Sequence, residues 1–177
     1  NALVEFCDEH EIPYELCGKL IVATQTDELP RLDALNERAT ANGVQGHELV
    51  GPDRVHEIEP HVTALKALWV PSTGIVDFTR LANTYANLIR EAGVKVLLNA
   101  PVETSWISGG LRYVRAGEAE YSARLFVNCA GLHADRVARQ LGAQTRVRIM
   151  PFRGEYYTLR TESAWLVQGL IYPVPNP

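Results

Sequence analysis

Long apolar runs are absent from this sequence of 177 residues. No run approaches the ~18 apolar residues of a membrane span, and the first residues lack the basic start of a secretory signal peptide. Only three cysteines occur, Cys7, Cys17 and Cys129, without C-x-x-C spacing. Such cysteine usage argues against a disulfide framework and a zinc site. We therefore expect no transmembrane segment and a reducing, cytoplasmic location, with peripheral contact to the inner membrane as the alternative.

Clusters of basic residues are absent as well. The 17 Lys and Arg residues and the 21 Asp and Glu residues are scattered along the chain, for a net charge of −4. Because nucleic acids and anionic membranes are bound by clustered cations, we expect no nucleic-acid partner. Of the five histidines only His56 and His61 are near one another. With no Cys or carboxylate in ligand register beside them, they predict no metal site.

The first half of the chain alternates helix and strand patterns. Residues 19–24 form a nearly unbroken apolar run of the kind found in strands that are buried on both faces. Asp77 precedes a helical pattern and is interpreted as its N-cap. The other elements predicted here are helices at 1–11, 26–43, 51–60 and from 77 or 79 to 91, and two strands that flank 71–74.

The second half is richer in strand patterns. A meander is predicted around the Gly109-Gly110 turn, followed by a helix over 134–141. The predicted strands are 94–98, 102–107, 111–114, 119–121, 125–127, 146–149, 155–159 and 170–172. Together with the first half, these patterns predict a mixed α/β (α+β) chain in which two sheets interleave.

A short apolar strand that runs into Asn128-Cys129-Ala130-Gly131 is the most informative motif. An Ala-Gly pair at the carboxyl end of a strand lets a dinucleotide approach the backbone, because neither side chain blocks it. An ordinary strand-to-helix turn is the alternative. Cys129 and His133 are also spaced as a nucleophile and a base, but no third group to orient the base is evident.

Four segments carry a resemblance to a known family: residues 17–24, 71–77, 124–135 and 151–157. In this order they resemble the L-2-hydroxyglutarate oxidase/dehydrogenase family, which belongs to the D-amino-acid-oxidase-like flavoproteins. The resemblance implies FAD as cofactor and a small dicarboxylate hydroxy acid as substrate. It implies that a hydride leaves substrate C2 for flavin N5 while a base takes the hydroxyl proton, which gives 2-oxoglutarate.

The resemblance also implies a domain organisation. Residues 1–77 would belong to a mixed-sheet substrate domain, residues 78–145 to a partial, Rossmann-like FAD-binding domain with an inserted β-meander, and residues 146–177 again to the substrate domain. No G-x-G-x-x-G occurs among the 13 glycines, although this motif normally holds the FAD pyrophosphate. We therefore interpret the chain as an interior piece of a larger enzyme.

The resemblance assigns residues to the cofactor. The backbone of Val102 would hydrogen-bond the adenine edge, which requires backbone groups that no neighbouring strand uses; a plain sheet valine is the alternative. The turn at Asn128 would lie beside the pyrophosphate and the ribose. The cofactor-binding residues predicted in this way are Val102, Asn128, Cys129, Ala130, Gly131, Ser72, Thr73, Gly74 and Gly154.

Further residues are predicted to face the substrate. A guanidinium pairs carboxylates bidentately, so Arg153 suits a dicarboxylate; a surface pair with Glu155 is the alternative. The full set of candidate catalytic residues is His61, Arg153, Tyr156 and Tyr172. The electron acceptor, oxygen or quinone, is left open. Two rival functions are another flavin oxidase acting on an amino acid or glycerol 3-phosphate, and an isolated non-catalytic domain.

Overall fold

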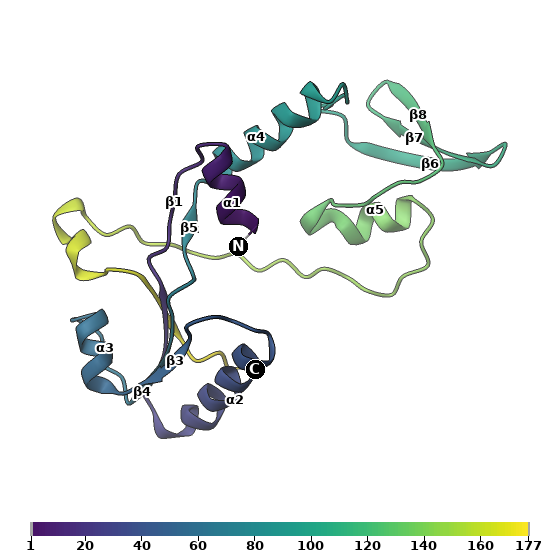
Figure 1. Ribbon diagram of the computed structural model, residues 1–177. Coiled ribbons are helices and arrows are strands. Elements are labelled where there is room, and N and C mark those ends of the chain that lie inside the picture. The colour runs from purple at the N-terminus through teal and green to yellow at the C-terminus, as the bar shows by residue number, and fades with distance from the viewer. Residues whose placement is uncertain (1, 177) are drawn as a thin grey trace. The chain divides into compact units, whose positions relative to one another are not determined.

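The computed structural model describes residues 2–176, which fold into two compact units (Figure 1). One unit is Gly93–Tyr157, and the other contains the residues up to Ala92 together with those from Thr158 onward. The compact units divide at 92/93 and 157/158, whereas the family resemblance implies domain boundaries at 77/78 and 145/146, and the assignment of domains stays a prediction.

A four-stranded mixed sheet forms the centre of the larger unit. Its order is β3 (Glu48–Val50), β4 (Lys66–Val70), β2 (Lys19–Ala23) and β9 (Leu170–Pro173). Strand β2 pairs antiparallel with β4 and parallel with β9, although β9 lies about 150 residues further along the chain. A separate two-stranded ladder joins β1 (Tyr14–Glu15) to β5 (Ile75–Val76).

Both faces of β2 are covered, as its unbroken apolar run predicts. Leu20 and Val22 belong to a core cluster with Val55 of helix α3 (Pro52–Ile58). Ala23 packs on the opposite face with Leu32 of helix α2 (Leu29–Ala41). Figure 1 shows α2 and α3 beside this sheet. Because successive side chains of a strand point to opposite faces, one continuous apolar run supplies both clusters.

The remaining helices of this unit are α1 (Ala2–Glu9), α4 (Phe78–Glu91) and the short 3₁₀ helices η1 (Thr26–Glu28) and η3 (Thr161–Leu166). Asp77 is the N-cap of α4, as predicted, since its Oδ1 accepts the backbone N–H of Arg80 at 2.9 Å. Helix α1 ends two residues earlier than predicted. Glu11, which follows it, has a positive φ of 52° that no helix can contain.

The smaller unit contains the predicted meander. Strands β6 (Val102–Ser108), β7 (Leu111–Ala116) and β8 (Ala119–Ala123) pair antiparallel in that order. The 3₁₀ helix η2 (Gly131–His133) and helix α5 (Ala134–Gln140) follow. The C-terminal end of α5 is tied to the meander, because Ser105 Oγ donates to the carbonyl of Gln140 and Arg112 Nη1 donates to that of Leu141.

Four predicted strands are not strands in this structure: 94–98, 125–127, 146–149 and 155–159. A strand needs a neighbour that completes its ladder of backbone hydrogen bonds, and these segments pair with no strand among residues 2–176. Their apolar side chains are exposed instead, as at Leu98, Leu125, Val127 and Val147.

Candidate functional site

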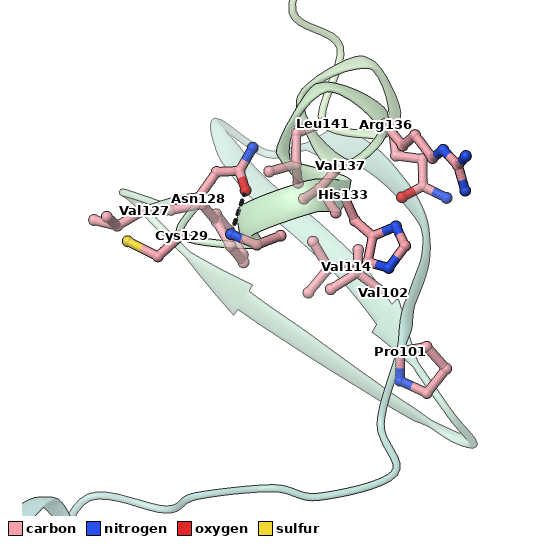
Figure 2. Close-up of a pocket in the computed structure, with 13 residues that line it drawn as sticks. Pro101, Val102, Val114, Val127, Asn128, Cys129, His133, Arg136, Val137 and Leu141 are labelled. Carbon is pink, nitrogen blue, oxygen red and sulfur yellow. Dashed lines mark hydrogen bonds between the residues drawn. The ribbon is translucent and has the colours of Figure 1, made fainter. Parts of the chain in front are cut away.

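A cavity of about 500 Å³ lies in the smaller unit between the meander, the turn at Asn128 and helix α5 (Figure 2). It brings together Val102, Asn128, Cys129 and Ala130, four residues that the sequence assigned to the cofactor. Val102 begins β6, and a register irregularity follows it before Thr104. Because β6 is an edge strand of its sheet, its outer backbone groups pair with no strand among residues 2–176, although the Glu103 carbonyl accepts from Gln140 Nε2 at 3.4 Å.

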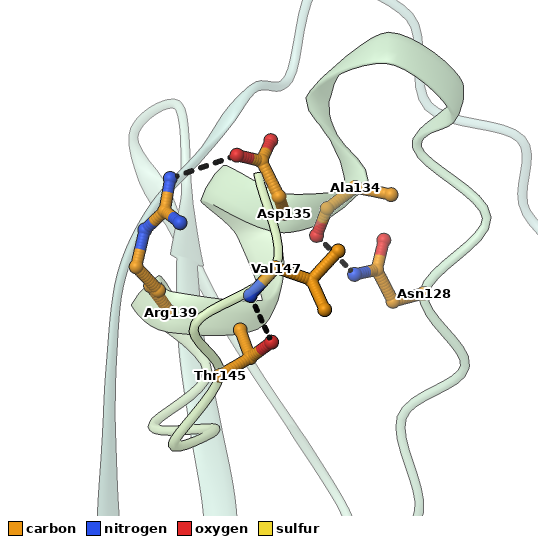
Figure 3. Close-up of polar contacts among 6 residues, drawn as sticks. All are labelled: Asn128, Ala134, Asp135, Arg139, Thr145 and Val147. Carbon is orange, nitrogen blue, oxygen red and sulfur yellow. Dashed lines mark hydrogen bonds and ion pairs between the residues drawn. The ribbon is translucent and has the colours of Figure 1, made fainter. Parts of the chain in front are cut away.

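The turn itself is built by the Asn128 side chain. Asn128 Oδ1 accepts the N–H of Ala130 at 3.2 Å, and Asn128 Nδ2 donates to the carbonyl of Ala134 at 2.8 Å. Asparagine suits this position because its amide mimics a backbone turn. Asn128 therefore shapes the lip of the cavity, with its side-chain amide already engaged (Figures 2 and 3).

Gly131 comes directly after this turn in the sequence. Its backbone is in the left-handed conformation, with φ of 54°. A Cβ added here would meet nothing within 4 Å. The residue does not line the cavity directly, but it begins η2 one residue after Ala130. Its backbone conformation favours glycine, and the space beside it is open.

Helix α5 contributes a polar rim that the sequence reasoning missed. His133, the last residue of η2 and the N-cap of α5, lines the cavity together with Arg136 and Gln140 of α5, and their three- and four-residue spacing places them on one side. That spacing was visible in the sequence and could have been used. Figure 2 shows the Cys129 sulfur directed away from the His133 ring. The arrangement therefore does not form the nucleophile and base considered above.

Asp135 holds α5 and the segment after it. Its side chain is 9% exposed and lies 3.0 Å from Arg139 Nη2 (Figure 3). Burial raises the pKa of the Asp135 carboxyl, but hydrogen bonds from Arg139 and from the backbone N–H groups of Ile149 and Arg136 outweigh burial, so the pKa lies below its ordinary value. Asp135 is thus a structural carboxylate.

The electrostatics of the smaller unit favour an anion. Gly93–Tyr157 contains nine Lys and Arg residues against five Asp and Glu residues, although the whole chain is acidic. Arg112, Arg115 and Arg139 are engaged within the unit. The Arg136 side chain, on the cavity rim, has no ion pair among residues 2–176.

Other predicted residues lie in the larger unit. Ser72 and Gly74 line a pocket of about 80 Å³ beside α1. A Cβ on Gly74 would lie 2.2 Å from the carbonyl oxygen of Glu15, so glycine permits a close approach of two backbone segments here. The carbonyl of Thr73 accepts the N–H of Gly18 at 2.8 Å. Thr73 and Gly74 therefore make backbone contacts with the segment that contains Glu15 and Gly18.

Two candidate substrate residues occupy separate places in the same unit. Tyr172, on β9, is 50% exposed, and Lys19 Nζ lies 5.8 Å from its ring centroid. His61 follows α3 and meets Trp165 edge to face, with ring centroids 5.0 Å apart. The structure does not bring His61 and Tyr172 into contact.

The remaining predicted residues, Arg153, Gly154 and Tyr156, lie on the irregular segment that follows α5. Arg153 Nε is 3.8 Å from Glu155 Oε1, and the Arg153 side chain is 87% exposed. Tyr156 is also exposed, and its ring lies close to Gly154. The surface pair with Glu155 is therefore present, and the Arg153 guanidinium remains open to a ligand.

Comparison with known proteins identifies the family. The family model described as "FAD dependent oxidoreductase" (DAO) matches residues 1–177. The chain belongs to the FAD-dependent oxidoreductase family. FAD is therefore the cofactor of its family, as the sequence predicted.

Relatives within this FAD-dependent family are similar over nearly the whole chain. The L-2-hydroxyglutarate dehydrogenase of Indibacter alkaliphilus is 39% identical over 100% of the chain and 45% of its own length. The mitochondrial L-2-hydroxyglutarate dehydrogenase of Caenorhabditis elegans is 42% identical over 98% of the chain and 41% of its own length. The chain thus spans less than half the length of these curated relatives.

Two solved structures share the fold. L-proline dehydrogenase from P. horikoshii matches 96% of the chain and 46% of its own length, with a TM-score of 0.79 and 17% identity. L-alpha-glycerophosphate oxidase from Mycoplasma pneumoniae, solved with FAD bound, matches 93% of the chain and 44% of its own length, with a TM-score of 0.72 and 17% identity. These likenesses confirm the predicted mixed α/β fold.

The residues present fit part of the family's FAD. The cavity in the smaller unit has apolar walls from Val102, Val114 and Val137 and a rim with His133 and Arg136, and the unit as a whole has more basic than acidic residues. An adenine ring needs the apolar wall, and phosphates need cations and backbone N–H groups. Among residues 2–176, no group of three or more His, Cys, Asp or Glu side chains is placed to hold a metal ion. None of the described helices is long and apolar enough to cross a bilayer.

Proposed function

We propose that this chain is part of an FAD-dependent enzyme that oxidises L-2-hydroxyglutarate to 2-oxoglutarate. The observation that carries the proposal is the 39–42% identity to proteins named L-2-hydroxyglutarate dehydrogenase over 98–100% of the chain. The solved neighbours that act on proline or glycerophosphate are only 17% identical, so they support the fold alone.

The smaller unit would hold part of the cofactor. Backbone groups at the outer edge of β6, beginning at Val102, would meet the adenine edge, and the turn from Asn128 to Gly131 would approach the pyrophosphate. The position of β6 at the edge of its sheet and the open space beside Gly131 support this arrangement. When bound, FAD supplies the acceptor for the hydride that leaves the hydroxy acid.

The larger unit would belong mainly to the substrate domain, and its mixed sheet supports that assignment. Helix α4, which the sequence placed in the FAD-binding domain, is part of this compact unit. Candidate groups for the substrate in this unit are the Tyr172 phenol and the His61 imidazole; the Arg153 guanidinium and the Tyr156 phenol, which belong to the smaller unit, are further candidates. Charged and hydroxyl donors of this kind pair well with carboxylates.

The test uses the longer protein that contains this chain, purified with its flavin. L-2-hydroxyglutarate should bleach the flavin absorbance under anaerobic conditions and yield 2-oxoglutarate, while D-2-hydroxyglutarate, L-glutamate and glycerol 3-phosphate should not. Bleaching by L-glutamate or glycerol 3-phosphate instead would overturn the proposal in favour of the corresponding rival oxidase. Reoxidation by oxygen or by a soluble quinone then identifies the electron acceptor.

The cellular location remains a prediction. The three cysteines are free, which fits the reducing, cytoplasmic compartment expected from their number. The relative from C. elegans is named mitochondrial. Fractionation of cells that express the longer protein at its natural level would distinguish these locations.

A further inference from the structure

Lys19 is a basic residue of the larger unit, in which acidic residues are in excess. It is the first residue of β2 and is half-buried, yet no carboxylate among residues 2–176 forms an ion pair with it. Its ammonium faces the Tyr172 ring instead, 5.8 Å from the centroid. Lys66, at the opposite end of the paired strand β4, shows the usual arrangement, with Nζ 2.7 Å from Asp33 Oδ1. Lys19 therefore has charge available for a ligand.

Lys19 lies in the sheet between two segments that are expected to face the flavin and the substrate. In the ladder Lys19 lies between Val70, the last residue of β4, and Leu170, the first residue of β9. The turn that follows Val70 contains Ser72–Gly74, and β9 contains Tyr172, so two segments expected to face the flavin and the substrate flank Lys19. Backbone hydrogen bonds fix both, because Gly18 N donates to Thr73 O at 2.8 Å and Leu170 N donates to Gly18 O at 3.1 Å.

A buried carboxylate holds the start of β9 in register. Glu59 is 2% exposed, and its oxygens accept the backbone N–H groups of Gln168 and Gly169. A Cβ on Gly169 would lie 2.5 Å from the carbonyl oxygen of Cys17, so the two chains pass as closely as backbone allows. Lys19 and Tyr172 are thus held on a rigid sheet, which suits a site that must position a substrate.

The larger unit, which contains Lys19, has an excess of acidic residues. The larger unit has 16 Asp and Glu residues against eight Lys and Arg residues. A dianionic substrate would be repelled by such a surface unless cations were placed locally where it binds. A half-buried ammonium that pairs with no carboxylate among residues 2–176, 5.8 Å from the centroid of a tyrosine ring, meets that requirement.

We propose that Lys19 binds a carboxylate of the dicarboxylate substrate, with the Tyr172 hydroxyl as a second donor. The inference rests on the proposed function. Lys19 would act as a specificity-determining residue: it contributes binding of the anion and takes no part in proton or hydride transfer. The sequence reasoning did not select Lys19, because its place beside Tyr172 depends on the parallel pairing of β2 with β9.

The first experiment measures glutarate, which lacks the reacting hydroxyl, as a competitive inhibitor of the flavin-loaded longer protein. Lys19→Gln should raise the inhibition constant of glutarate ten- to a hundredfold, the loss expected for a charge-assisted contact. Lys19→Arg should restore part of it, and the control Lys66→Gln should leave it unchanged. Flavin content and melting temperature show whether each variant is folded. An inhibition constant within twofold of wild type in folded Lys19→Gln would overturn the proposal.

A second experiment needs no variant. Glutarate should slow acylation of Lys19 by an amine-reactive reagent in the wild-type protein, as measured by mass spectrometry, and leave the exposed Lys95 unaffected. Equal rates with and without saturating glutarate would also overturn the proposal. The role of Lys19 and the proposed function can fail separately. If the wild type oxidises L-2-hydroxyglutarate but neither glutarate experiment shows an effect of Lys19, only the role of Lys19 is rejected. If the wild type does not oxidise L-2-hydroxyglutarate, the proposed function is rejected.

Discussion

Gly131 and Gly117 have nearly the same backbone conformation, with φ of 54° and 62°, and neither has an atom within 4 Å of an added Cβ. A larger residue at either position would destabilise the folded state by roughly 1–2 kcal/mol, because L side chains are strained in the left-handed region. Only Gly131 comes directly after residues that line the cavity, Asn128 to Ala130. The pair therefore separates backbone strain from the loss of a ligand.

Gly131→Leu in the longer protein should abolish flavin binding, because a branched side chain would occupy the space that the dinucleotide needs. Gly117→Leu should keep the flavin at a similar loss of stability. Flavin absorbance per protein, compared with circular dichroism, measures both effects. Normal flavin content in folded Gly131→Leu would show that the Ala130-Gly131 step is only a turn.

Arg153 and Arg160 are also a matched pair: their side chains are 87% and 86% exposed, and each has a carboxylate oxygen at 3.8 or 4.0 Å, from Glu155 or Glu162. Arg153→Lys should lower kcat/KM for L-2-hydroxyglutarate about ten- to a hundredfold with flavin retained, since an ammonium cannot reproduce the bidentate guanidinium. Arg160→Lys should have no effect. If kcat/KM of Arg153→Lys stays within about twofold, the carboxylate contacts lie elsewhere; loss of flavin would assign Arg153 to the cofactor.

Glu59 links elements that are far apart in the sequence. Glu59→Leu should lower the free energy of unfolding by about 2–4 kcal/mol, because the buried N–H groups of Gln168 and Gly169 lose their acceptor. Glu57→Leu, two residues earlier, removes an exposed pair with Arg54 and should cost less than about 1 kcal/mol. Urea unfolding of both variants measures the difference. Equal effects would mean that Glu59 contributes no more than a surface carboxylate.

At the scale of elements, Glu28 stabilises the entry into η1 and α2. Its carboxylate accepts the backbone N–H groups of Gln25 and Thr24, at 2.9 and 2.7 Å, and these bonds hold its pKa below the ordinary 4.5. A carboxyl whose pKa is lowered by folding adds stability at pH values above its ordinary pKa. That stability is lost as the pH falls through the pKa of the folded state.

The melting temperature of the wild-type protein should therefore fall more steeply than that of Glu28→Gln as the pH is lowered from 4.5. The exposed Glu37→Gln, on α2 without capping contacts, serves as the control. Thermal melts between pH 6 and pH 3 measure the slopes. Parallel curves for wild type and Glu28→Gln would contradict a capping contribution from the charged form.

Element prediction succeeded where local chemistry is sufficient and failed where a partner strand is required. Asp77 was recognised as a cap because capping involves residues three apart. The β6–β8 meander was recognised because its strands are joined by short turns at glycines. The four segments that are not strands carry the correct apolar pattern, but a pattern does not supply the neighbouring strand that completes the ladder.

At the scale of the whole molecule, the two units differ in charge: nine basic and five acidic residues in one, eight and 16 in the other. The basic unit contains the cavity predicted for FAD. Nevertheless, the chain has no G-x-G-x-x-G among its glycines. Glycine amides and a helix N-terminus normally supply much of the pyrophosphate site.

The 177-residue chain purified by itself should therefore carry little FAD and show no oxidase activity. The visible absorbance of bound flavin, compared with that of the longer protein prepared in the same way, measures the occupancy. A yellow preparation with about one FAD per chain would refute this expectation.

The sequence alone determined the features that depend on neighbours within a few turns of chain. These include the doubly buried run of β2, the Asp77 cap, the hairpins of the meander, and the Asn128–Gly131 turn with the family resemblance that it carries. Tertiary structure alone decided the parallel pairing of β2 with β9, the burial of Glu59 and the position of Lys19, which pairs with no carboxylate among residues 2–176. Contacts such as that of Glu59 with Gln168 join residues 109 positions apart, and no local pattern encodes such a contact because its free energy arises only when the sheet has formed.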